Sequence, residues 1–99
     1  MDVLTAELIE RWSQMFAALA GGGDVPPALR LRTEGMMEAA ALLGMATEDE
    51  LLLAMGERYQ FAFGRGIAED FGEDWRDFYP FPQIPAMGRR APVYPTTND

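Results

Sequence analysis

Apolar side chains recur along this chain at steps of three and four residues, and glycine or proline interrupts the pattern between successive stretches. Such spacing places the apolar residues on one face of an α-helix. The first stretch, from about Val3 to Ala20, ends at Gly21-Gly22-Gly23, because three glycines lose too much backbone entropy to continue a helix. The apolar face of this predicted helix consists of Leu4, Leu8, Trp12, Met15, Phe16 and Leu19.

The second and third stretches carry signals for where a helix begins and ends. Pro26-Pro27 suits a first helical turn, where the missing N–H is not needed, and Gly44 suits the left-handed position after the helix. Thr47 and Glu50 have the spacing of a capping box, and the helix that follows ends at Gly64. We expect these two helices to direct the following side chains towards the core: Leu29, Met36, Met37, Ala40, Leu43, Leu51, Leu52, Met55, Tyr59 and Phe63.

A fourth helix is predicted from Ile67 to Tyr79, with apolar residues spaced by four, four and three at Ile67, Phe71, Trp75 and Phe78. Gly72 lies inside this stretch, so two short turns are the alternative. From Pro80 onward, five of the seven prolines favour an extended arm. The predicted fold class is therefore all-α: a small four-helix domain of helical hairpins at 1–79, followed by a proline-rich extended C-terminal arm at 80–99.

The arm has two interpretations. Phe81 and Ile84 favour a lid, in which residues 80–86 fold back over the helices. Residues 87–99 stay open between a tail without fixed structure and a recognition strip that proline holds extended. Arg89-Arg90 is the basic pair in this part of the chain, and we include both residues in the predicted partner-binding site as contacts for an acidic patch.

The amino-acid composition excludes most kinds of catalytic site. None of the 99 residues is histidine or cysteine, so the commonest general base and the usual zinc ligands are missing. The acidic residues at 69–77 do not follow the spacing of a calcium loop. From the residues present we expect no enzymatic activity, no cofactor and no metal site.

Charge and hydropathy indicate the environment and the kind of partner that suit the chain. No apolar run approaches the roughly 20 residues that a membrane span needs, and Asp2 stands where a signal peptide carries basic residues, so we expect a cytoplasmic protein. The net charge of -8 comes from 16 acids and 8 arginines, and it argues against direct contact with phosphate. The same charge suits docking on a basic protein surface.

Residues 38–47 resemble the first helix and turn of a DNA-reading helix-turn-helix. In that motif the next helix enters the major groove with basic and amide side chains at its start. Here the next helix begins with Glu48, Asp49 and Glu50, which phosphate repels. An ordinary helical hairpin is the better interpretation.

Five acids within nine residues form the main candidate for a partner-binding site: Glu69, Asp70, Glu73, Asp74 and Asp77. On one continuous helix, residues 69, 73 and 77 form one row and residues 70 and 74 a neighbouring row. Regularly spaced carboxylates imitate a phosphate track and suit a groove lined with arginine and lysine. The alternative is a solvated face opposite the apolar stripe, with no binding role.

In size and charge, with the acids at 69–77 and the helix Thr47–Phe63, the chain resembles the small inhibitors of phages and mobile elements. Among these it is most similar to anti-CRISPR proteins that block the RNA-guided surveillance complex of type I systems. The resemblance implies a non-enzymatic inhibitor that docks its acidic helix on basic surfaces of Cas subunits. The alternative is a helical adaptor or regulatory protein that acts through a homodimer or an obligate hetero-complex and does not bind nucleic acid itself.

Overall fold

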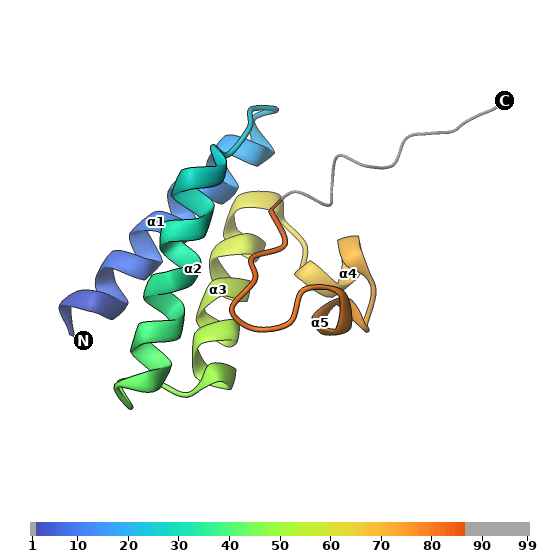
Figure 1. The fold of residues 1–99 in the computed structure, drawn as a ribbon. Coiled ribbons are helices and arrows are strands. Elements are labelled where there is room, and N and C mark those ends of the chain that lie inside the picture. Colours follow the sequence, from blue (N-terminus) through green and yellow to red (C-terminus); the bar gives the residue numbers. More distant parts are fainter. Residues whose placement is uncertain (1, 87–99) are drawn as a thin grey trace, which may run out of the picture.

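A computed structural model describes residues 2–86, which form five helices and contain no strand (Figure 1). The helices are α1 (Val3–Ala20), α2 (Pro27–Leu42), α3 (Glu48–Phe63), α4 (Ile67–Phe71) and α5 (Trp75–Phe78). The all-α prediction is confirmed, but the arrangement has three long helices and two short ones in place of four helices. None of the helices in this part of the chain is both long and apolar enough to cross a membrane.

Helix α1 begins and ends where the sequence predicts. The Asp2 carboxylate accepts a hydrogen bond from the Thr5 N–H at 2.8 Å and so caps the first turn, and this bond lowers the pKa of Asp2. The N–H groups of Gly21 and Gly23 bond back to the last turn and close the helix. The buried face of α1 consists of Leu8, Trp12, Met15 and Phe16.

Local signals also determine the ends of α2 and α3. Thr47 accepts the Glu50 N–H at 3.0 Å while the Glu50 carboxylate accepts the Thr47 N–H at 2.9 Å, so the capping box forms. Gly44 and Gly64 both have positive φ, at 73° and 78°, as expected after each helix. One core prediction is wrong: Leu43 is 70% exposed, because α2 ends at Leu42 and Leu43 lies in the turn.

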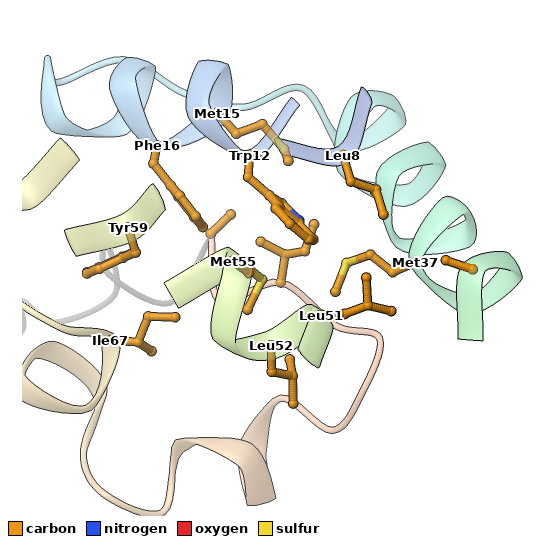
Figure 2. Packing of buried hydrophobic residues seen from close by; sticks show 13 residues of the cluster. Leu8, Trp12, Met15, Phe16, Met37, Leu51, Leu52, Met55, Tyr59 and Ile67 are labelled. Atoms are coloured by element: carbon orange, nitrogen blue, oxygen red, sulfur yellow. The ribbon is translucent and has the colours of Figure 1, made fainter. Parts of the chain in front are cut away.

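The core lies where α1 packs against α3 and α2 (Figure 2). Phe16 of α1 meets Tyr59 of α3 edge to face, with ring centroids 5.1 Å apart, which is a favoured geometry for two aromatic rings. Helix α2 contributes Met37 and Ala40, both 0% exposed. Helix α3 buries Leu51, Leu52, Met55 and Tyr59, as its spacing predicts.

The segment 80–86 returns to this core and lies over the helices, which is the lid that the sequence favoured. Ile84, Pro85 and Ala86 are buried, and Phe81 packs against the core cluster. Ile84 also donates its N–H to the Glu34 carboxylate of α2 at 2.8 Å in a buried contact. In Figure 1 this orange-red coil follows α5 and crosses α3.

The predicted helix from Ile67 to Tyr79 is broken, and the two short turns allowed by Gly72 are found instead. Gly72 has φ of 101°, a conformation outside the α-helical region that glycine adopts without a Cβ penalty. Helix α4 therefore ends at Phe71 and α5 begins at Trp75. Of the expected apolar stripe, Ile67 is buried, but Phe78 is 68% exposed.

We expect Glu34→Ala to lower the free energy of unfolding by about 1–3 kcal/mol, because the buried Ile84 N–H loses its acceptor and the largely buried Arg30 loses its ion-pair partner. The Ile84 amide should also exchange with solvent faster, as measured by hydrogen exchange. Glu38→Ala is the matched control on the same helix, since Glu38 is exposed, and it should change stability by less than about 0.5 kcal/mol. Equal effects of the two substitutions in urea denaturation would contradict the role given to Glu34.

Candidate protein-binding surface

The acids at 69–77 do not form the rows that the sequence predicted. Glu69 lies on α4, Asp77 lies on α5, and Glu73 is in the link between the two helices. The row at 69, 73 and 77 requires one continuous helix, and the backbone at Gly72 interrupts it. The carboxylates therefore cover a folded corner and do not form a straight track.

Asp70 has a structural role. Its carboxylate accepts hydrogen bonds from the Tyr59 hydroxyl of α3 and from the Arg65 guanidinium, and its side chain is only 12% exposed. The bond to Asp70 raises the pKa of Arg65 above its ordinary value. Because Tyr59 is buried, Asp70 fixes α4 against the core. Its carboxylate is thus used in contacts within the fold.

The other four acids are exposed: Glu69, Glu73, Asp74 and Asp77. Arg76 is the single base in the segment 67–79, and its guanidinium pairs with Asp49 at the beginning of α3, 3.2 Å away. This pair connects α5 to α3 and leaves the four carboxylates with no arginine of their own segment. Arg89 and Arg90, the basic members of the predicted site, lie outside the described residues 2–86.

An apolar hollow of about 490 Å³ lies beside these acids, between α3 and the pair α4–α5. Leu52, Leu53 and Gly56 of α3 line one side, and Ile67 and Trp75 line the other. A second hollow of about 380 Å³ lies across α3, where the helix faces the beginning of α1. Leu53 and Glu57 line both hollows, so the two adjoin each other along the exposed side of α3, and we call them together the α3 groove.

The sequence patterns did not predict the α3 groove. One signal was present: Leu51, Leu52 and Leu53 are consecutive, and successive residues on a helix are about 100° apart, so three of them cannot share one buried face. Leu51 and Leu52 are buried while Leu53 is 68% exposed. Residues of α1, α4 and α5 help to form the hollows on either side of Leu53. The spacing of residues within α3 does not predict where those helices lie.

Gly56 is unusual within the α3 groove. It lies in the interior of α3, where glycine costs about 0.5–1 kcal/mol relative to alanine. Apart from its neighbours in α3, a Cβ added at Gly56 would meet no atom within 4 Å, so packing against the other described elements does not require glycine. Gly35 of α2 has the same open surroundings, but it does not line either hollow of the groove.

The acidic corner and the α3 groove together present carboxylates and apolar side chains. Within residues 2–86, no three acidic side chains are placed to share a metal ion. Comparisons of the chain with protein-family models, curated proteins and solved structures found no match.

Asp70→Ala should lower the free energy of unfolding by about 1–3 kcal/mol, because the buried Tyr59 hydroxyl loses the carboxylate it bonds. Asp74→Ala is the matched control, since Asp74 is exposed and its side chain makes no capping bond, and it should shift stability by less than about 0.5 kcal/mol. Thermal and urea denaturation measure both effects. If the two variants are equally stable, the structural role of Asp70 is wrong.

Proposed function

We propose that this protein acts by binding another protein through the exposed acidic corner formed by α4 and α5, and that it catalyses no reaction. The observation that carries the proposal is the group of four exposed carboxylates, Glu69, Glu73, Asp74 and Asp77, beside the α3 groove. The only base of that segment, Arg76, is already paired with Asp49. The surface is thus acidic at its edge and apolar beside it.

The two parts of this surface contribute differently to binding. Exposed ion pairs contribute roughly 0–1 kcal/mol each, so the carboxylates would mainly speed association and select a basic partner. Burial of apolar surface contributes about 25 cal/mol per Å², and the groove beside the acids offers such surface. A partner that carries both a basic patch and an apolar anchor matches this arrangement.

For the identity of the partner, the proposal is an anti-CRISPR role against a type I surveillance complex. Surfaces that hold nucleic acid are basic, and a compact acidic protein competes for them by occupying the same arginines and lysines. The net charge of -8 and the acidic corner support this choice. Because the carboxylates lie on a corner and not along a straight helix, the competition would block the surface and would not imitate a nucleic-acid strand along its length.

The direct test is inhibition of target-DNA binding by a panel of purified type I complexes loaded with guide RNA. The protein should abolish the DNA mobility shift of a susceptible complex, and Glu69→Gln/Glu73→Gln/Asp77→Asn should weaken inhibition at least about tenfold, since it removes three of the contact charges. Raising the salt concentration should slow association of the unmodified protein.

The matched control removes three acids elsewhere, as Glu7→Gln/Glu10→Gln/Glu38→Gln on α1 and α2. All three residues are exposed, and Figure 1 places α4 and α5 on the far side of α3 from α1. This variant should inhibit as well as the unmodified protein. Equal loss in both triple variants would show that only net charge matters and would contradict the role of the corner. No inhibition of any complex in the panel would contradict the anti-CRISPR role.

A helical adaptor that acts through a homodimer or an obligate complex is the second candidate. Exposed large apolar side chains favour it, including Leu53, Phe61 and Phe78 at 68%, 82% and 68% exposure. Light scattering over a range of concentrations separates the two candidates. The triple variant Glu69→Gln/Glu73→Gln/Asp77→Asn is called the acidic-corner variant. A dimer that persists in high salt, and that this variant still forms, would favour the adaptor.

A further inference from the structure

The α3 groove has properties that suit the binding of a helix. Its two hollows, about 490 and 380 Å³, are each within the roughly 300–1,000 Å³ typical of binding pockets in proteins. They lie on either side of Leu53, so apolar side chains from one turn and the next of a bound helix would enter both. Leu53 itself, largely exposed, would pack between them.

Gly56 gives an independent reason to place a backbone there. A helix-interior glycine that neither the local φ nor internal packing requires weakens α3, and its missing side chain leaves space in the larger hollow. Helices that pack together lie about 8–10 Å apart, and the shorter separations need small residues at the contact. Glycine at this position therefore favours close approach of a second helix across α3.

The charge of the groove selects the occupant. Asp2, Glu50 and Glu57 line the two hollows, and no arginine lines either one. Asp2 and Glu50 already cap their own helices, whereas Glu57 makes no hydrogen bond or ion pair with other residues in the range 2–86. A second copy of this chain would bring its own acidic rim and a net charge of -8 to the contact, which repulsion disfavours.

We propose that the α3 groove binds an amphipathic α-helix of the protein partner, with apolar side chains in the two hollows and arginine or lysine against Glu57. This proposal rests on the proposed function, because it assigns the apolar part of the same partner surface. It adds the form in which the partner is recognised, namely helix in groove. The acidic corner then contacts basic residues beyond that helix.

The test uses a synthetic peptide of about 18 residues, roughly 27 Å long as a helix, with leucines on one face and lysine and arginine on the other. Two control peptides have the same length: one scrambled so that the leucines form no face, and one with glutamate in place of every base. Fluorescence anisotropy of the labelled peptides measures each Kd. We expect binding of the amphipathic basic peptide alone.

Variants of the protein locate the binding. Gly56→Leu fills the larger hollow and should weaken peptide binding at least about tenfold. Leu53→Gln should weaken peptide binding as well. Gly35→Leu is the matched control, because Gly35 is also interior to a helix with open surroundings but lies outside the groove, and it should leave the Kd within about twofold. Gly56→Ala should raise the Tm by about 2–8 °C and still weaken the peptide.

Circular dichroism confirms that each variant is folded before its Kd is compared. No binding of the basic peptide, or equal Kd values for Gly56→Leu and Gly35→Leu, would overturn the proposal. So would a dimer of the unmodified protein that Gly56→Leu converts to monomer, since the occupant would then be a second copy. If Gly56→Leu weakens the peptide while the acidic-corner variant still inhibits fully, the groove stands and the proposed use of the corner fails. If instead the acidic-corner variant loses inhibition while Gly56→Leu binds the peptide as well as the unmodified protein does, only the proposal for the α3 groove is overturned.

Discussion

The packing of α1 against α3 is the contact on which the rest of the structure depends. Trp12 and Phe16 of α1 are fully buried, and Phe16 meets Tyr59 edge to face. Because α1 also packs on α2, it holds the two other long helices in place. The exposed side of α3, with Leu53 and Glu57, then borders the α3 groove, which opens beside α4 and α5 and reaches the beginning of α1. Which side chains of α3 remain exposed is therefore determined by which of them the core buries.

Two carboxylates connect this core to the later part of the chain, and both act between elements distant in sequence. Glu34 of α2 accepts the Ile84 N–H, which holds residues 80–86 over the helices. Asp70 accepts the Tyr59 hydroxyl and pairs with Arg65, which holds α4 at the end of α3. Both of these carboxylates have partners in partly or fully buried positions, whereas Glu69, Glu73, Asp74 and Asp77 are exposed.

The proposed function follows from this division between structural and exposed carboxylates. Counting acids within the segment assigns the same role to five residues, whereas their contacts divide them into one that stabilises the fold and four that face solvent. The apolar groove beside these four carboxylates would contribute most of the binding free energy, because exposed ion pairs contribute little and the burial of apolar surface contributes more. The combination of steering charges and an apolar seat is a general arrangement for binding a basic, amphipathic partner.

The sequence by itself determined the three long helices and where they begin and end. Capping side chains, first-turn prolines and left-handed glycines act within four or five residues, so Asp2, Thr47, Gly44 and Gly64 could be interpreted without the fold. It also determined which chemical groups are available for a site. Gly72 left two possibilities open in the sequence, one helix or two short turns, and the structure decided between them; the tertiary structure alone decided that Asp70 would turn inward. It also decided that Leu53 would stand between two hollows. Those outcomes depend on partners such as Tyr59, Arg65 and Trp75 in other elements, and spacing along a single helix contains no information about them.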